Sequence, residues 1–234
     1  MALPKLNTIN YEMDLPSNGE KIKYRPFLVK EQKNLLIAQE TEDPKIIESA
    51  LADIIKECTF GSIDPYKTPL FDIEYIFLKI RGKSVGEKVI LNLLCPDDGK
   101  TRVETEIDLS EVNVQMNVEH TNTVKITDSI SLVMRYPTLS SMNDFSDDGQ
   151  ITSIFNLIKK CVHEVRDGDE IHHRIDISET ELDEFVDSMS TKNFEDISSF
   201  FETMPKIMHI VDVVNPKTKK KNEVVIEGIQ SFFE

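Results

Sequence analysis

This 234-residue chain is 39% hydrophobic, with 10 prolines and 8 glycines, a globular composition that excludes an intrinsically disordered, fibrous or low-complexity protein. Its 42 acidic and 27 basic residues give a formal net charge of −15, which disfavours binding to nucleic acid and to anionic membrane surfaces. The sequence shows neither a signal-peptide pattern nor an apolar run of about 18 residues, and Cys58, Cys95 and Cys161 are odd in number and far apart. We therefore expect a cytosolic protein with reduced thiols and no membrane span.

The acidic residues are concentrated in one stretch. Between Asn143 and Met204 there are 16 acidic and 5 basic side chains, a net charge of −11, whereas the N-terminal part is nearly balanced. The shift begins just after Tyr136-Pro137. We therefore expect two domains, residues 1–136 and residues 137–234.

The N-terminal third is predicted to be mainly helical. Residues 1–20 carry prolines and a Ser-Asn-Gly turn and are interpreted as an arm, and residues 21–27 alternate as an edge strand. Asp43-Pro44 supplies an N-cap and a first-turn proline to a helix with one broad apolar face. Gly82 is expected to end a later helix. The predicted helices span residues 29–40, 44–58 and 70–81.

From residue 88 the apolar period changes from helical to alternating. A hairpin is predicted from residues 88–95 and 102–109 around the turn Pro96–Gly99, and residues 112–116 and 124–136 alternate as well. The middle of the chain is therefore interpreted as an antiparallel sheet of about four strands.

After Pro137 the helical period returns, over residues 151–162, 178–186 and 193–204, with Ser178 and Glu181 placed as a capping box. A last strand pair spans residues 207–214 and 224–229. The predicted fold class is α+β: N-terminal helices packed on a central antiparallel sheet with hairpins, followed by an acidic helical segment and a C-terminal β-hairpin.

No motif typical of catalysis or metal binding occurs. The histidines lie outside any Gly-x-Ser-x-Gly or His-Glu-x-x-His pattern, and Arg81-Gly82-Lys83-Ser84 lacks the first glycine of a P-loop and follows a helix. Zinc binding by Cys161 and His163 with the adjacent His172 and His173 is disfavoured, because neighbouring side chains point to different faces. We expect no catalytic residue, no cofactor and no metal.

Two hairpin turns resemble each other. They read Cys95-Pro96-Asp97-Asp98-Gly99-Lys100 and Asn215-Pro216-Lys217-Thr218-Lys219-Lys220, and each follows an apolar strand. Both look like zinc-knuckle hairpins, but only one of the four required cysteines is present. Either hydrogen bonds and packing hold a metal-free knuckle pair, or these are two ordinary hairpins with proline at a turn position.

Several apolar side chains are candidates for contacts with other proteins. Two adjacent phenylalanines at a chain end are expected to dock on the chain's own core or on a neighbour. The acidic stretch carries further Phe and Met residues at helical spacing, including Phe185, Met189 and Phe194; most should fill the core, and a few should stay exposed beside an acidic rim. The predicted partner-binding residues are Phe200, Phe201, Met204, Phe232 and Phe233.

Four segments carry a resemblance to a known family: Tyr24–Glu31, Asp72–Glu87, the Cys95-Pro96 turn with Ile107–Leu109, and Ile226–Phe233. They resemble the baseplate hub subunit family of T-even-like contractile-tailed bacteriophages, and the second segment is the most specific. The acidic stretch matches that family only in its general helical pattern.

The resemblance implies a late phage protein of tail morphogenesis and virion assembly, either a baseplate hub subunit or a chaperone that assembles the hub. It implies no catalytic residue, cofactor or metal, and partners among phage hub and tail proteins. The location would be the host bacterial cytoplasm during assembly, or the tail baseplate of the virion. Nucleic acid, membrane and small-molecule substrates are not expected. The alternative is an enzyme, such as a hydrolase that uses His172 or His173 with Asp169.

Overall fold

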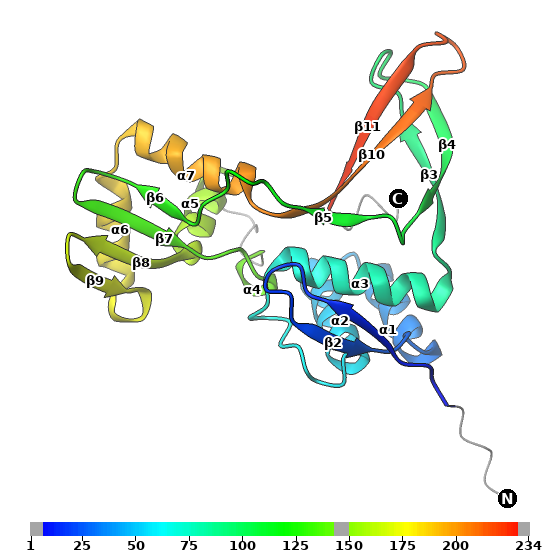
Figure 1. Cartoon of the computed structure of the whole chain (residues 1–234), viewed down its shortest axis with the longest axis horizontal. Coiled ribbons are helices and arrows are strands. Elements are labelled where there is room, and N and C mark those ends of the chain that lie inside the picture. Colours follow the sequence, from blue (N-terminus) through cyan, green and yellow to red (C-terminus); the bar gives the residue numbers. More distant parts are fainter. Residues whose placement is uncertain (1–6, 143–149, 229–234) are drawn as a thin grey trace, which may run out of the picture. The chain divides into compact units, whose positions relative to one another are not determined.

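The structure, a computed structural model, describes residues 7–142 and 150–228 (Figure 1). Helices and short antiparallel sheets occupy separate stretches of the chain, and the last two strands pair with each other, which confirms the predicted α+β class. Within the described ranges, none of the helices combines the length and the apolarity that a membrane crossing requires.

Two compact units make up the chain. Unit 1 comprises Met1–Gln115 together with Lys206–Glu234, and unit 2 comprises Met116–Pro205. Unit 2 carries 18 acidic and 7 basic residues, a net charge of −11, so most of the negative charge of the chain belongs to this unit.

The bounds of these units differ from the predicted domains, residues 1–136 and 137–234. A boundary at Pro137 would separate β7 (Ile130–Met134) from β8 (Val162–Asp167), which pair with each other in one antiparallel sheet. The shift in charge along the sequence therefore begins inside unit 2, after two strands of its sheet have already been formed.

Unit 1 begins with a hairpin of β1 (Tyr11–Asp14) and β2 (Lys21–Tyr24). The strand β1 lies within residues 1–20, which the sequence predicts to be an arm because of their prolines and turn residues. The turn after it is anchored on a helix, because the buried carboxylate of Asp72 accepts a hydrogen bond from the backbone N–H of Ser17 at 3.1 Å. A contact 55 residues away in the chain thus orders a segment whose own sequence signals are weak.

Three helices follow in unit 1, as predicted: α1 (Val29–Glu40), α2 (Pro44–Cys58) and α3 (Leu70–Val85). The predicted cap is present, since the Asp43 side chain accepts a hydrogen bond from the backbone N–H of Lys45 at 2.9 Å. The helix α3 is the central one, because it buries side chains around most of its circumference. Its buried apolar residues are Phe71, Ile73, Ile76, Phe77, Leu78 and Ile80.

The prediction that Gly82 ends α3 is wrong. The helix continues to Val85, and Gly82 lies buried inside it, where an added Cβ would meet the side chain of Glu87 at 3.4 Å. The helix ends instead at Gly86, whose φ of +128° is rarely accessible to a residue with a side chain.

The remainder of unit 1 consists of two small sheets around one core. The strands β3 (Lys88–Leu94) and β4 (Arg102–Asp108) form the predicted hairpin. The strands β10 (Lys206–Val214) and β11 (Lys221–Glu227) form the predicted C-terminal pair, and β5 (Asn113–Gln115) joins the free edge of β10. The strands predicted between residues 88 and 136 thus belong to three different sheets rather than to one.

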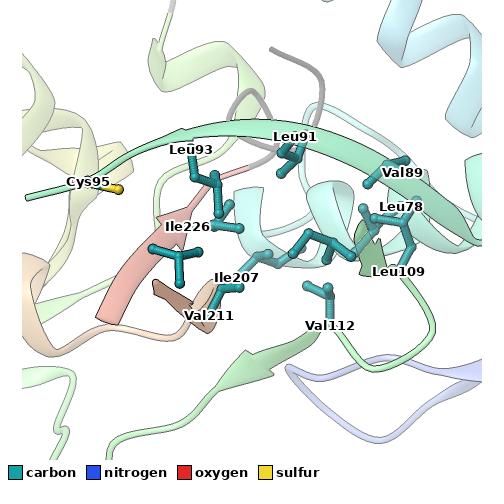
Figure 2. Close-up of a cluster of buried hydrophobic side chains, with 12 residues drawn as sticks. Leu78, Val89, Leu91, Leu93, Cys95, Leu109, Val112, Ile207, Val211 and Ile226 are labelled. Carbon is teal, nitrogen blue, oxygen red and sulfur yellow. The ribbon is translucent and has the colours of Figure 1, made fainter. Parts of the chain in front are cut away.

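Side chains from both sheets meet in a common cluster (Figure 2). Every second side chain of β3, namely Val89, Leu91 and Leu93, points into this cluster. Leu78 of α3 also belongs to it. Burial of each branched side chain stabilises the unit by about 1.5–3 kcal/mol relative to exposure. The cluster includes Val89, Leu91, Leu93, Ile107, Ile207, Val211 and Ile226, with Cys95 at one end in the view of Figure 2.

Unit 2 is built on a four-stranded antiparallel sheet in the order β6 (Thr123–Lys125), β7, β8 and β9 (Glu170–His173). Helices α5 (Gln150–Cys161), α6 (Glu179–Asp187) and α7 (Thr191–Thr203) share its core. The core residues include Leu132, Ile158, Val165, Leu182 and Ile197.

Two parts of unit 2 were not predicted, the strands β8 and β9. The helical pattern was expected to run through Val162, but this residue is the first of β8, and the helix α5 ends one residue earlier. A short helix α4 (Leu139–Met142) precedes α5, and a single turn η1 (Arg174–Asp176) joins β9 to α6. The capping box before α6 is confirmed, since Ser178 and Glu181 exchange hydrogen bonds.

We expect a fragment of residues 116–205 to fold alone, with a cooperative thermal transition in far-UV circular dichroism. It keeps the whole sheet and the three helices that cover its core. A fragment of residues 137–234 loses β6 and β7 and should show no cooperative transition, because β8 would lack its inner neighbour. The opposite outcome would favour the domain boundary at Pro137.

Candidate functional site

The two similar turns of unit 1 lie against each other. Asp97 is the link between them: one carboxylate oxygen accepts a hydrogen bond from Asn215 Nδ2 at 2.8 Å, and the other accepts one from the hydroxyl of Thr218. The backbone N–H of Asp97 donates in turn to Asn222 Oδ1 at 3.2 Å. Three hydrogen bonds therefore connect hairpin tips that are more than 100 residues apart in the chain.

Each turn is also closed internally, and in the same way. The carbonyl of Cys95 accepts from the N–H of Gly99 at 3.0 Å, and the carbonyl of Asn215 accepts from the N–H of Lys219 at 2.9 Å. Gly99 and Lys219 occupy equivalent positions, and both have a φ of +63°. The resemblance between the two turns is thus a resemblance of backbone conformation.

Carboxylate hydrogen bonds stabilise this arrangement. The hydroxyl of Thr218, followed by the Asn215 amide, holds the pKa of Asp97 below its ordinary value. The side chain and the backbone of Thr101, with the backbone of Lys100, hold the pKa of Asp98 lower still. Hydrogen bonds to Asp97 and Asp98 thus link the two turns and close the first of them.

Cys95, the one remaining knuckle cysteine, is fully buried at the end of the unit 1 core. Burial raises the pKa of its thiol, as it does for Cys58, to about 11, and for Cys161, to about 12. All three cysteines are free thiols, as expected. Within residues 7–142 and 150–228, no group of three His, Cys, Asp or Glu side chains has an arrangement that could hold a metal ion.

Metal-free folding stays a prediction. We expect the protein purified without chelator to contain no stoichiometric zinc, because a neutral, buried Cys95 thiol is the single soft ligand at the paired turns. Elemental analysis by mass spectrometry measures this, and one equivalent of zinc per chain would contradict it.

Lys219→Gly is expected to stabilise the protein by roughly 0.5–1 kcal/mol. The left-handed backbone costs a residue with a side chain about 1–2 kcal/mol, and glycine offsets part of that gain through its larger unfolded-state entropy. Lys217→Gly is the matched control: its φ is not positive, so it should destabilise or change nothing. Denaturant melts that rank the two variants in the opposite order would contradict the assignment of strain to Lys219.

The histidines of the alternative hydrolase lie on the edge strand β9, and both are exposed. His172 Nε2 lies 3.8 Å from a carboxylate oxygen of Glu170, and His173 Nδ1 lies 3.5 Å from one of Glu164. The nearest carboxylate partners of the two imidazoles are therefore Glu170 and Glu164 rather than the predicted Asp169.

Cys161 and His163 point to different faces of the chain, as expected. Cys161 is buried in the core of unit 2, whereas His163, two residues later on β8, is exposed. The change from helix to strand between them does not bring their side chains together.

Two clefts with apolar walls lie among the described residues of unit 2. The larger, which we call the α6 cleft, has a volume of about 400 Å³ and lies between α6 and the strands β7, β8 and β9. Its apolar walls are formed by Ile130, Val165, Ile177, Leu182 and Phe185. Its polar residues are the carboxylates Asp167, Asp176 and Glu181 and the imidazole of His172.

The smaller cleft has a volume of about 340 Å³ and lies between α5, α6 and α7. Half-buried Met189 and Phe194 line it, with Phe155, whose ring centroid is 5.3 Å from that of Phe194. Asp187 is its one carboxylate. The Phe and Met residues of the acidic stretch that line these clefts are therefore Phe155, Phe185, Met189 and Phe194.

The predicted partner-binding residues have different environments. Phe200 is 2% exposed and packs against the rings of His120 and Tyr136, with centroid distances of 5.2 and 5.9 Å. Phe201 is half-buried and stands edge-on to Phe200, and Met204 is half-buried at the end of α7. Phe232 and Phe233 lie outside the described residues. The burial of Phe200 favours a core role for this ring, and partner contacts of the others stay a prediction.

Comparison with known proteins gives one finding. The model of a family described as T4 bacteriophage base plate protein matches residues 7–234. No curated protein and no solved structure gives a significant match to the chain. The family match includes both units and the acidic stretch between Asn143 and Met204, where the sequence resemblance alone was only general.

Proposed function

Because the chain belongs to the family of the T4 bacteriophage base plate protein, we propose that it acts in building the baseplate hub, as a hub subunit or as a chaperone that assembles the hub. The match over residues 7–234 is the observation that carries this proposal, since it extends along almost the whole chain. The proposed role is non-enzymatic and depends on protein–protein contacts during tail morphogenesis.

The surface of unit 2 supports this mode of action. Its clefts offer apolar side chains beside carboxylates, and an apolar patch with a charged edge is typical of protein interfaces. The net charge of −15 disfavours phosphate backbones and anionic lipids as partners. The proposed partners are other hub and tail proteins, met in the host bacterial cytoplasm during assembly.

Co-expression of the tagged chain with the phage hub and tail proteins, followed by pull-down at low and moderate salt, tests the proposal. We expect at least one of these proteins to be retained, and less of it at the higher salt. A chain that lacks residues 230–234 tests whether Phe232 and Phe233 contribute to retention. Retention of none of these proteins, with turnover of a small ester or phosphate by the purified chain, would favour the hydrolase with His172 or His173 and Asp169.

A second measurement separates the two proposed roles. A hub subunit remains in the particle, so its peptides should appear in purified tails at a fixed ratio to the other baseplate proteins. A chaperone should be abundant in the lysate of infected cells and absent from purified tails. Quantitative mass spectrometry of both samples decides between them.

A further inference from the structure

We propose that the α6 cleft of unit 2 binds a basic apolar segment of a partner protein, one that places an aliphatic or aromatic side chain between lysine or arginine residues. This inference rests on the proposed function and adds to it the location of a contact and the chemistry of the partner. The walls of the cleft and the charges around it favour this kind of partner.

The walls of the cleft are suited to an apolar side chain. Leu182 and Val165 belong to the core of unit 2, and the half-buried Phe185, Ile130 and Ile177 extend that core to the surface. A volume of about 400 Å³ is large enough for one or two large side chains, and small for a folded domain. The expected occupant is therefore a segment of chain rather than a globular surface.

The charges at the cleft are of one sign. Asp167 and Asp176 form no ion pair with any Lys or Arg of the described residues. The nearest arginines in the sequence are engaged elsewhere, since Arg166 pairs with Glu164 and Arg174 pairs with Glu179. Two carboxylates at an apolar cleft thus lack a counter-charge from their own part of the chain.

A third carboxylate is held in position. Glu181 accepts hydrogen bonds from the backbone N–H and the hydroxyl of Ser178, at 2.9 and 2.6 Å. These bonds hold the pKa of Glu181 below its ordinary value. The Glu181 side chain therefore already has a fixed position when a lysine or arginine of a partner approaches it. The net charge of −11 on unit 2 also attracts a basic partner.

One exposed apolar residue adjoins a carboxylate of the cleft in the sequence. Ile175, which precedes Asp176 in η1, is 92% exposed and does not belong to the core of unit 2. Ile171 is also exposed, but it precedes the cleft residue His172 on β9 and therefore points to the opposite face of the sheet. An exposed isoleucine beside an unpaired carboxylate repeats the combination of apolar and acidic groups found in the cleft. The complementary partner is apolar and basic.

Two other surfaces specify a partner less well. The groove between α1 and α2 is larger, about 720 Å³, but Lys30 and Lys45 line it together with Asp53 and Glu57, so it selects no charge. A second copy of this chain could offer the basic turn Lys217–Lys221, but this turn carries no large apolar side chain for the cleft walls.

The test combines the pull-down with a defined probe. The probe is a fluorescent peptide that alternates lysine with leucine and carries one photoreactive phenylalanine; a peptide with glutamate in place of lysine is its control. We expect fluorescence anisotropy to show that the lysine peptide binds to the full-length chain and that the glutamate peptide does not. Photo-crosslinks of the lysine peptide should map to β8, β9 and α6. Crosslinks elsewhere would overturn the location.

Two protein variants test the residues. The double variant Asp167→Asn with Asp176→Asn, which we call the rim variant, changes only exposed side chains of the cleft. It should weaken peptide binding roughly fivefold to tenfold, and the binding that remains should depend less on salt. Phe185→Ser should weaken binding roughly tenfold or more through lost apolar contact. The matched control, Asp196→Asn with Glu202→Gln on α7, removes the same charge away from the cleft and should change binding less than twofold.

The outcomes separate this inference from the proposed function. If the wild-type chain retains hub proteins and the rim double variant retains them equally, the cleft is not the contact and the assembly role stands. If the wild-type chain retains none of them, the assembly role fails whatever the peptide shows. If the control double variant weakens binding as much as the rim variant, binding depends on overall charge and the cleft proposal is overturned. Self-association in sedimentation that the rim variant abolishes would identify a second copy as the occupant and overturn the proposed partner.

Discussion

Replacing Glu31 with alanine is expected to lower the free energy of unfolding by about 3–5 kcal/mol, the cost of leaving one member of a buried ion pair alone. The Glu31 carboxylate accepts a hydrogen bond from Arg25 Nη2 at 2.9 Å, and the two side chains are only 6% and 9% exposed. It also accepts one from the backbone N–H of Leu28, at 2.7 Å, just before α1. Chemical denaturation followed by far-UV circular dichroism measures the change.

The helix α1 should respond most strongly to this substitution. Its only buried residues are Glu31 and Ala38, whereas Val29, Leu36 and Ile37 are at least half exposed. The attachment of α1 to unit 1 thus depends on Glu31 more than on apolar packing. Amide hydrogen exchange should become faster in α1 than in α2 when Glu31 is replaced.

Glu57→Ala is the matched control for Glu31→Ala. Its carboxylate also lies near Arg25, at 4.0 Å, but the side chain is 58% exposed, so its loss should cost no more than about 1 kcal/mol. Equal losses for Glu31→Ala and Glu57→Ala would contradict the role given to the buried pair.

The lowered pKa of the Glu31 carboxyl predicts that the free energy of unfolding depends on pH. Burial acts to raise the pKa of Glu31, but hydrogen bonds from Arg25, the Leu28 N–H and Lys30 outweigh it and leave the pKa below its ordinary value of 4.5. A lowered folded-state pKa means that the stabilisation is present above the ordinary value and is lost as the pH falls through the folded value. The difference in stability between wild type and Glu31→Gln should therefore shrink between about pH 7 and pH 3. A difference that stays constant over this range would contradict the argument.

Replacing Asn215 with alanine is expected to cost roughly 2–4 kcal/mol. Its fully buried side chain donates to Asp97 at 2.8 Å and accepts from the backbone N–H groups of Lys217 and Thr218, at 2.9 and 3.3 Å. Each lost hydrogen bond costs about 1 kcal/mol, and more where a buried partner stays unpaired. The control Asn92→Ala, on the exposed face of β3, should change stability by about 0.5 kcal/mol or less.

Asn215→Asp tests the link between the two turns directly. This variant keeps the acceptors for Lys217 and Thr218 but places a second carboxylate where an amide now donates to Asp97 at 2.8 Å. It should destabilise the protein at neutral pH by like-charge repulsion and recover part of the loss on acidification, when one carboxyl becomes a donor. A loss that does not depend on pH would mean that Asp97 and Asn215 are not coupled in solution.

Several elements could be predicted because their signals are local. The N-cap Asp43 with Pro44 marks the start of α2, the capping box of Ser178 and Glu181 marks α6, and strict alternation on both sides of Pro96–Gly99 marks the hairpin of β3 and β4. Each of these signals lies within a few residues of the structure it specifies. Gly82 shows the limit of such signals, because a glycine that could end a helix instead lies buried inside α3, which continues to Val85.

The pairing of strands and the burial of individual side chains depend on contacts between residues that are far apart in the sequence. Phe185 and Phe200 both occur at helical spacing in the same acidic stretch, yet Phe185 lines an open cleft and Phe200 is buried under Tyr136. Nothing within one helical turn distinguishes the two rings. Which of them meets solvent is decided by how the helices pack on the sheet.

The amino-acid sequence by itself determined the class of fold, most helices, the two similar turns and the acidic stretch, because periodicity, caps and charge are properties of neighbouring residues. Only the tertiary structure decided that β5 pairs with β10, that β7 pairs with β8 across Pro137, and that Asp97 joins the two turns. The α6 cleft is of the same kind, since its walls and carboxylates come from five separate elements. Such sites depend on the closure of long loops between strands and helices, and no local pattern of residues specifies which distant segments meet.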